Sequence, residues 1–361
     1  MKLLCLDAGS SSLKFAVYRA ARDGTPARLT SGSFPATADA ESALDRVLES
    51  LDGEAGAPFA ATGHRIVFGG PRYQRPVLAD DAVVRELEGL VGIEPLHLRA
   101  ELDLLAAVRR RFPGAASVLA FDTAFHARAP AIAKRLPLPG DLDPLLMRYG
   151  FHGLSYEYVV SQLGDDRGRT VVAHLGSGAS LCALRDGAPV DTTMGFSALG
   201  GLMMATRPGD LDPGAILRLL DDGYDATRLR DLLYRRSGLL GVSGKTAEMR
   251  ELLETQAADP AARDAVELFV YQLVKHLGSM VAVLGGLDRL VFTGGIGERA
   301  PAIRNAVASA FQFLGVRLDD EANRASERTV SCPESAVRVL VVPTDENLVI
   351  ARHAIALVSA S

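Results

Sequence analysis

The chain has 361 residues, a length typical of two domains that each bury a core. Hydrophobic residues make up 48% of it and charged residues 23%, which is typical of a globular protein and excludes a disordered chain. The 39 basic and 44 acidic side chains give a net charge of −5, so no overall basic surface would attract nucleic acid. Any phosphate group that the protein binds must therefore be held locally.

The cysteines and the N-terminal residues indicate a cellular location. Cys5, Cys182 and Cys332 are far apart in the sequence and lack the spacing of a metal site, so we expect reduced thiols in the cytosol. The opening residues, MKLLCLDAGS, contain too short an apolar run for a signal peptide or a membrane-spanning helix. We therefore expect a cytoplasmic protein that does not bind membranes.

Two similar β-meanders are predicted about half a chain apart. Each pairs two strands around a Gly/Ser turn, at 2–7 with 13–19 and at 170–174 with 180–185. Aligning Gly9 with Gly176 gives an offset of 167 residues, and a DG turn that can lead into a third strand follows in both copies. The alternative is a coincidental likeness between two turns. A true duplication predicts two similar halves.

Apolar residues recur every three or four positions between and after the meanders, which predicts helices. These helices are expected at 41–51, 99–112, 245–254 and 262–285. Short buried strands are expected at 117–121, 289–293 and 337–342. Strands that alternate with helices indicate α/β layers.

Three glycine-rich loops are candidates for nucleotide binding. The turns in DAGSSSLK at 7–14 and HLGSGAS at 174–180 leave backbone N–H groups open to an anion, and across a cleft they would hold a polyphosphate. Either could instead be an ordinary hairpin turn. The loop at 293–307, TGGIGERAPAIRNAV, passes from a strand through glycines into a helix and would admit a nucleoside.

A fourth glycine-rich segment, GVSGKT at 241–246, is excluded as a Walker A loop. That motif requires a glycine where Leu239 stands. We interpret Lys245 as the start of a helix.

Candidate chemical groups stand beside glycines or at strand ends. Arg65 and Arg207 each offer a planar fork for a carboxylate or phosphoryl group, and His152 could donate to the same oxygens. Asp122 follows an apolar strand, as Asp345 and Glu346 do, where a carboxylate can bind Mg²⁺ or its waters. The alternatives are surface ion pairs, a core histidine and helix capping.

The sequence resembles the acetate kinase family of the actin, hexokinase and sugar-kinase superfamily from residue 3 to about residue 352. Eleven segments match family motifs in order: DAGSSSLK, GHRIVFGG, FDTAFH, RYGFHGLSYEYV, HLGSGAS, DTTMGF, TRPGDLDPG, SGLLGVSG, EMRELL, FTGGIGE and PTDENLVIA. The resemblance implies an α/β fold of two duplicated actin/hexokinase-like (ribonuclease H-like) domains around an active-site cleft. It also implies ATP or ADP as co-substrate, Mg²⁺ (or Mn²⁺) as cofactor, and a homodimer.

The resemblance assigns roles by motif match. It implies catalytic roles for Arg65, Asp122, His152 and Arg207 and a metal-binding role for Glu346, to which we add Asp7. The implied nucleotide contacts are Ser12, Lys14, His174, Leu175, Gly176, Ser177, Gly178, Glu248, Met249, Arg250, Gly294, Gly295, Ile296, Gly297 and Glu298. The implied substrate pocket consists of Arg65, Val67, Leu96, Phe151 and Ala198.

Several residues depart from the family pattern. Asp7 and Ser177 stand where asparagine is usual, and Ala198 replaces a proline of the acyl pocket. Asp7 alone would favour a sugar kinase, which would need a polar sugar pocket that the sequence does not show. The sum of departures would favour a catalytically silent nucleotide-binding paralogue, and the retained Arg65 and Asp122 argue against it.

The sequence therefore predicts a kinase that makes an acyl phosphate and ADP reversibly from ATP and acetate or another short-chain carboxylate. A preference for propionate or butyrate is the main alternative. The first domain is expected at 1–147 together with a C-terminal helix at 346–361, and the second, with most of the nucleotide site, at 148–345.

Overall fold

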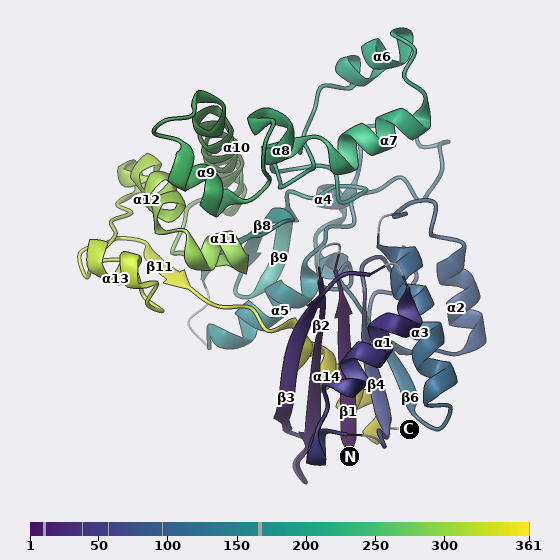
Figure 1. The fold of residues 1–361 in the computed structure, drawn as a ribbon. Coiled ribbons are helices and arrows are strands. Elements are labelled where there is room, and N and C mark those ends of the chain that lie inside the picture. Colours follow the sequence, from purple (N-terminus) through teal and green to yellow (C-terminus); the bar gives the residue numbers. More distant parts are fainter. Residues whose placement is uncertain (10–11, 38, 57, 96, 165–167, 361) are drawn as a thin grey trace. The chain divides into compact units, whose positions relative to one another are not determined.

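The protein is described by a computed structural model that covers residues 1–9, 12–37, 39–56, 58–95, 97–164 and 168–360. It divides into two compact units, each with its own mixed β-sheet (Figure 1). Unit 1 comprises Met1–Ala127, Phe151–Tyr158 and Asp345–Ser361. Unit 2 comprises Arg128–Gly150 and Val159–Thr344.

The sheet of unit 1 has the strand order β3-β2-β1-β4-β6-β5. Its strands are β1 (Lys2–Ala8), β2 (Ser12–Ala20), β3 (Pro26–Pro35), β4 (Ala61–Ile66), β5 (Val77–Leu78) and β6 (Ala116–Phe121). The first three form an antiparallel meander, and β1, β4 and β6 run parallel. The carboxyl ends of β1, β4 and β6 therefore meet at one edge, where α/β proteins place their ligands.

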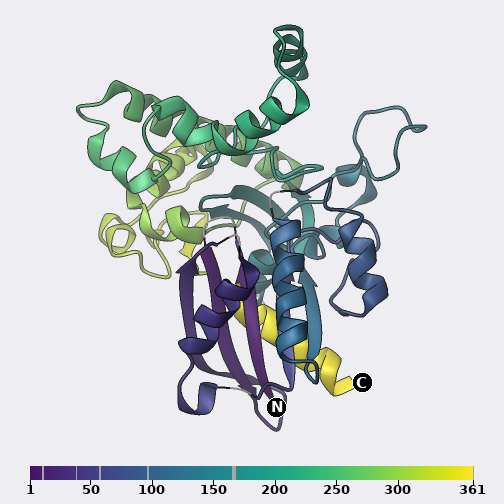
Figure 2. The same ribbon diagram turned by 45° about the vertical axis from the view of Figure 1, so that its right-hand side comes forward.

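Helices cover both faces of this sheet (Figure 2). They are α1 (Ala40–Glu49), α2 (Asp81–Glu88), α3 (Leu98–Arg111) and α14 (Glu346–Ala360), with 3₁₀ turns at Gly53–Ala55 and Phe125–Arg128. Leu4 and Leu6 of β1 pack with α1 and α3, whereas Leu3 and Cys5 pack with α14. This alternation follows from the two-residue period of a strand.

The sheet of unit 2 has the strand order β11-β10-β7-β8-β9. Its strands are β7 (Arg169–Leu175), β8 (Ala179–Arg185), β9 (Ala188–Thr192), β10 (Arg289–Thr293) and β11 (Arg338–Val341). Its helices are α4 (Ala131–Lys134), α6 (Pro213–Asp221), α7 (Ala226–Arg235), α8 (Gly238–Ser243), α9 (Met249–Thr255), α10 (Pro260–Leu284), α11 (Gly294–Arg299), α12 (Pro301–Ala310) and α13 (Asp320–Ala325), with a 3₁₀ turn at Gln312–Leu314. One further helix, α5 (Gly153–Gln162), begins in unit 1 and ends in unit 2.

Apart from β5 of unit 1, the two sheets have the same strand order and directions, which confirms the predicted duplication. Adding the offset of 167 to β1 (Lys2–Ala8) gives Arg169–Leu175, the bounds of β7. β7, β8 and β9 form a second antiparallel meander, and β10 joins β7 in parallel as β4 joins β1. A repeated folding pattern around the glycine turns therefore explains the likeness better than coincidence.

The 25-residue helix α10 is long and apolar enough to cross a membrane by length and composition. In unit 2 it packs against α8, α9 and β8 and buries residues such as Phe269, Leu273 and Leu277. These contacts are those of a core helix that is partly open to solvent.

The predicted elements are confirmed except near Lys245. The predictions at 41–51, 99–112 and 262–285 correspond to α1, α3 and α10, and the three short strands to β6, β10 and β11. The helix expected at 245–254 is present as α9, but its predicted start at Lys245 is wrong: α8 ends at Ser243, Gly244 follows in a left-handed conformation, and α9 begins only at Met249. Between them Ser243 Oγ accepts hydrogen bonds from the N–H groups of Lys245 and Thr246.

Candidate functional site

The parallel strands of unit 1 bring an arginine and two aspartates to one edge of the sheet. Asp7 lies near the end of β1, Arg65 near the end of β4, and Asp122 directly after β6. Arg65 is paired with Ala120 in the register of β4 and β6, so its side chain lies within reach of Asp122. These three sequence-predicted residues therefore form a single cluster, which we call the Arg65 cluster.

Asp122 holds the guanidinium of Arg65. Nε and Nη2 donate to the same oxygen, Asp122 Oδ2, at 3.0 and 2.6 Å. Nη1 donates to the carbonyl oxygen of Ala8 at 3.2 Å and lies 3.5 Å from Asp7 Oδ1. The side chain of Arg65 is only 10% exposed, so these charge-assisted bonds are shielded from water.

Glu101 is a member of the cluster that was not predicted. Its Oε2 accepts a hydrogen bond from the backbone N–H of Val67 at 2.8 Å, and its Oε1 lies 3.5 Å from Arg65 Nη1. One signal in the sequence could have revealed it. Glu101 stands among Leu98, Leu102 and Leu105 on the apolar face of α3, where an acidic residue needs a buried partner.

Charges in the cluster shift one another's pKa values. Burial acts to lower the pKa of Arg65, but Asp122, Asp7 and the two glutamates outweigh it and raise that pKa well above its ordinary value. Burial raises the pKa of Glu101 to about 8, opposed by Arg65. Burial and the charges of Asp7 and Asp122 raise the pKa of Glu346 to about 7. Four carboxyl groups, of Asp7, Asp122, Glu101 and Glu346, thus surround the single guanidinium of Arg65, an excess of acidic groups.

This excess fits a divalent cation. Asp122 Oδ1 is buried and has no hydrogen-bond partner in the structure, and a buried carboxylate oxygen needs a donor or a cation. Within the described ranges no three His, Cys, Asp or Glu side chains form a metal cage by themselves. Mg²⁺ suits such a site, because it takes few protein ligands and completes its shell with water and phosphate oxygens.

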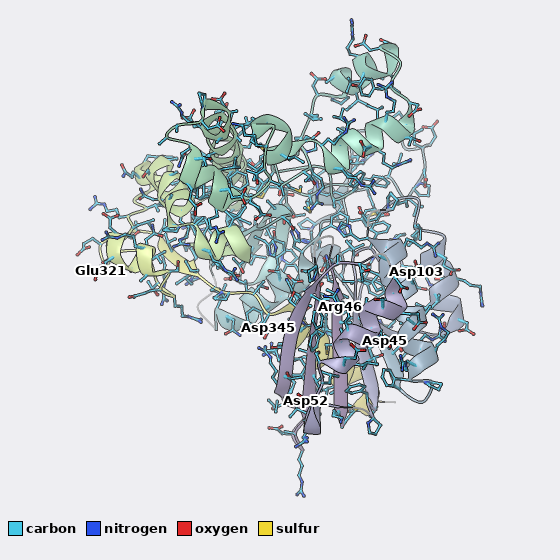
Figure 3. All side chains as sticks on the ribbon, viewed as in Figure 1. Asp45, Arg46, Asp52, Asp103, Glu321 and Asp345 are labelled. Carbon is cyan, nitrogen blue, oxygen red and sulfur yellow. The ribbon has the colours of Figure 1, made fainter. Side chains whose placement is uncertain are left out.

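Asp345 and Glu346 differ in what they contact. Asp345 Oδ1 accepts a hydrogen bond from Leu348 N at 3.1 Å and so caps α14. The same side chain forms an ion pair with Arg28, and Asp345 lies beside strand β3 (Figure 3). Glu346 is the first residue of α14 and interacts electrostatically with Asp7 and Asp122. Glu346 is therefore the better metal candidate of the two.

His152 and Phe151 lie in the segment that leads into α5. His152 has φ = +59°, a left-handed conformation that is rare outside glycine. Phe151 is buried, and its ring stacks on Phe68 with centroids 6.3 Å apart, while Val67 is buried next to Phe68 in the chain. Leu96, the fourth member of the predicted acyl pocket from this half of the sequence, lies outside the described residues, as do Ser10 and Ser11.

Unit 2 contains a cavity of about 570 Å³. It draws together three predicted nucleotide-binding segments: Gly176 and Ser177 after β7, Glu248 to Arg250 at α9, and Gly295 and Ile296 in α11. Its other lining residues are mostly apolar: Ala205, Ala247, Leu253, Glu254, Arg299, Ala300, Pro301 and Ala302. Apolar walls beside exposed glycine backbone suit a nucleoside.

The remaining predicted nucleotide contacts lie outside the lining of this cavity. Ser12 and Lys14 are on β2 of unit 1, where Lys14 Nζ is 3.8 Å from Asp7 Oδ2. His174 and Leu175 are buried at the end of β7, and Gly178 lies in the turn that follows. Gly294 and Gly297 are buried in α11. Glu298 Oε1 accepts hydrogen bonds from Gly294 N and Thr344 N, at 3.0 and 3.2 Å, and so joins the start of α11 to the segment that follows β11.

Arg207 and Ala198 are linked in the loop between β9 and α6. Arg207 Nη1 donates to the carbonyl oxygen of Ala198 at 2.8 Å, and both residues are buried. Lys245, from the excluded Walker segment, forms an exposed ion pair with Asp259 at 2.6 Å and does not line the cavity.

Comparisons with known proteins identify the family. The family model described as the Acetokinase family matches residues 31–352. The chain belongs to the acetokinase family. This membership makes it a kinase that transfers phosphate to a carboxylate, and the predicted actin/hexokinase-like α/β fold is confirmed.

Individual relatives match the chain almost from end to end. It is 43% identical to an acetate kinase of Rhodopseudomonas palustris (strain TIE-1), with 97% of each chain covered. The structure of a propionate kinase from Francisella tularensis superposes with a TM-score of 0.88 at 32% identity, covering 98% of each chain. Porphyromonas gingivalis acetate kinase gives a TM-score of 0.85 at 32% identity, covering 99% of each chain.

The raised pKa of Glu101 predicts a pH dependence of stability. Between pH 4.5, the ordinary carboxyl pKa, and about 8, the folded protein keeps a proton on Glu101 that the unfolded chain has released. The free energy of unfolding should therefore fall as pH rises through this range. Glu101→Gln, which keeps the acceptor for Val67 N–H but cannot titrate, should lose less stability.

Denaturant unfolding of both proteins at pH 5, 6, 7 and 8, in buffers without divalent cations, measures this difference. Glu346 titrates in both proteins and cancels in the comparison. Parallel curves for the two proteins would show that Glu101 is ionised throughout.

Proposed function

We propose that the chain catalyses reversible transfer of the γ-phosphoryl group of ATP to acetate or another short-chain carboxylate, giving an acyl phosphate and ADP. Family membership supplies the reaction class. The observation that carries the assignment of the acceptor site is the Arg65 cluster, in which a buried guanidinium is held rigidly beside Asp122.

The acceptor needs no general base, because a carboxylate is already ionised at pH 7. The chemical task is to bring two anions together and to neutralise the charge on the transferring phosphoryl group. We assign orientation of the acceptor to Arg65, and neutralisation to Arg207 and His152. Asp122 holds Arg65 in position and is a candidate to position Mg²⁺ or its waters.

The nucleotide is assigned to the cavity of unit 2. Met249, Leu253 and Ile296 supply apolar contacts for a base. Gly176 in the turn after β7 and Gly295 in α11 allow the backbone to approach ribose and phosphate. The turn Gly176 to Gly178 follows a buried strand and is suited to bind phosphate oxygens.

Mg²⁺, or Mn²⁺ in its place, is assigned to Asp122, Glu346 and Asp7. The unpartnered Asp122 Oδ1 and the raised pKa of Glu346 support this assignment, since a cation would satisfy the first and favour ionisation of the second. A bound divalent cation supplies charge neutralisation for phosphate oxygens.

Ala198 favours a longer acyl chain as a second candidate substrate. It replaces the bulkier proline that the family pattern has in the acyl pocket, and its carbonyl still accepts from Arg207. The similarity to a propionate kinase structure is in keeping with this choice. Each additional buried CH₂ contributes about 0.8 kcal/mol, or about fourfold in affinity.

A homodimer and a cytoplasmic location complete the proposal. Leu217 and Leu220 on α6 are 62% and 46% exposed, and this helix has no buried residue. Clustered exposed apolar side chains mark association surfaces. The three free thiols of Cys5, Cys182 and Cys332 agree with a reducing compartment.

The direct test is hydroxylamine trapping of the acyl phosphate with ATP, Mg²⁺ and a panel of acetate, propionate and butyrate. We expect hydroxamate to form, with kcat/KM for propionate equal to or above that for acetate. Ala198→Pro should shift the preference toward acetate. No hydroxamate with any acid would contradict carboxylate phosphorylation, and an unchanged preference for acetate in both proteins would contradict the role of Ala198.

Nucleotide binding in unit 2 is tested with Gly295→Val. A β-carbon at Gly295 meets no atom within 4 Å, so valine should be accommodated by the fold and occupy cavity space. The affinity for ADP, measured by calorimetry, should fall by about tenfold or more, because the valine occupies space that the nucleotide needs. A tenfold loss corresponds to about 1.4 kcal/mol of binding free energy.

Two variants serve as controls for this measurement. Gly278→Val introduces the same side chain at a position in α10 that is equally open and does not line the cavity, and Lys245→Ala removes the Walker-like lysine. Both should bind ADP within about twofold of wild type. A loss of binding in Lys245→Ala alone would place the nucleotide elsewhere.

A further inference from the structure

His126 is a buried histidine beside the predicted catalytic residues. It follows β6 in the 3₁₀ turn Phe125–Arg128 and is 1% exposed. Its ring is perpendicular to the ring of Phe125 and nearly perpendicular to that of Tyr156, with centroids 5.5 and 5.6 Å away. These contacts fix the direction in which the ring nitrogens point.

The Nε2 atom of His126 lies 2.9 Å from the carbonyl oxygen of Phe151. A carbonyl oxygen only accepts, so Nε2 carries the proton and donates. Burial lowers the pKa of His126 to about 4, opposed by the bond to Phe151, so the ring is neutral near pH 7. Nδ1 is then an unprotonated nitrogen, buried and without a partner in the structure.

The bond from His126 holds the peptide that precedes His152, and a second bond holds the peptide that follows it. Gly153 N donates to the carbonyl oxygen of Asp122 at 2.9 Å. A β-carbon at Gly153 would lie 2.1 Å from that oxygen, so the backbone approaches Asp122 as closely as only glycine allows.

Between these two bonds His152 adopts φ = +59°. The left-handed conformation is unfavourable for a residue with a β-carbon and persists where the surroundings impose it. The two anchors impose it, because each fixes one peptide plane on either side of the same α-carbon. The direction of the His152 imidazole depends on this backbone conformation.

We propose that His126 is a positioning residue, which holds His152 in its left-handed conformation through the carbonyl of Phe151. The inference rests on the catalytic role of His152 in the proposed function. His126 does not touch a substrate in this scheme; it acts only through the backbone on which His152 stands.

The test compares variants that remove or keep the donor. His126→Leu keeps an apolar side chain of similar size without the donor, whereas the amide nitrogen of His126→Gln can reach the carbonyl as Nε2 does. We expect kcat to fall about tenfold in His126→Leu, while KM for ATP stays within twofold of wild type. In His126→Gln at least half of that loss in kcat, on a logarithmic scale, should be recovered. Equal kcat in the wild type and His126→Leu would overturn the proposal.

His64→Leu is the matched control. His64 is also buried in unit 1, its pKa is lowered to about 3 by burial, and its Nε2 contacts Thr62 Oγ1 at 3.0 Å rather than the segment of His152. His64→Leu should keep kcat within twofold. A tenfold loss there as well would show that any buried histidine has this effect and would overturn the specific role of His126.

A double-mutant cycle separates positioning from general packing. When His152→Ala has already lost activity, adding His126→Leu should lower kcat by less than twofold, because the side chain that His126 positions is gone. A further tenfold loss would overturn the proposal. If His152→Ala alone keeps the wild-type kcat, the failure lies in the proposed function and removes the inference with it.

Thermal unfolding of each variant verifies that it folds. Should His126→Leu fail to fold, His126→Asn replaces it, because its amide nitrogen is too close to the backbone to reach the carbonyl of Phe151. It should show the same tenfold loss relative to His126→Gln, and equal kcat in the two amide variants would contradict the proposal.

Discussion

The buried guanidinium of Arg65 holds the ends of two parallel strands in unit 1 together. Nε and Nη2 both donate to Asp122 Oδ2, so β4 and the residue after β6 are joined by short charge-assisted bonds. Arginine keeps its charge when it is buried, and removing one partner of such a pair costs about 3–5 kcal/mol. Asp122 in turn accepts the N–H of Gly153 through its backbone. The segment that carries His152 therefore depends on the position of Asp122, and through it on Arg65.

The balance of charge around Arg65 connects the structure to phosphoryl transfer. Asp7, Glu101 and Glu346 add three carboxyl groups beside Asp122, and Asp7, Glu101 and Asp122 are buried, where water screens charge poorly. Glu101 avoids part of the cost by keeping a proton, since its pKa is raised to about 8. The carboxylate oxygens that do not contact Arg65 are available to a divalent cation. A site in which acidic side chains surround one buried arginine suits phosphoryl transfer, because a metal ion bound there would neutralise anionic phosphate oxygens.

The sequence predicted features that depend on local pattern, and it missed those that depend on distant contacts. The offset of 167 residues between the glycine turns predicted a second meander, and in the structure the same offset relates the bounds of β7 to those of β1. Strand ends predicted where Asp122 would lie. Glu101 was missed because its partners are distant in the sequence: Arg65 is on β4 and Val67 directly follows that strand, whereas Glu101 is on α3. Its place on an apolar helix face was nevertheless a signal. His126 was missed because its proposed role depends on a hydrogen bond to a backbone carbonyl 25 residues away.

Arg65 holds Asp122 in the structure, and its proposed second role, to orient the acceptor carboxylate, is tested most directly by Arg65→Gln. Formation of acyl phosphate from ATP, Mg²⁺ and a carboxylate can be followed by ³¹P nuclear magnetic resonance, with ADP binding measured on the same sample. The rate should fall by about 100-fold or more, as for the loss of other donors that stabilise a transition state, while ADP binds as in wild type. A rate within tenfold of wild type would contradict the assignment of Arg65 to the acceptor site.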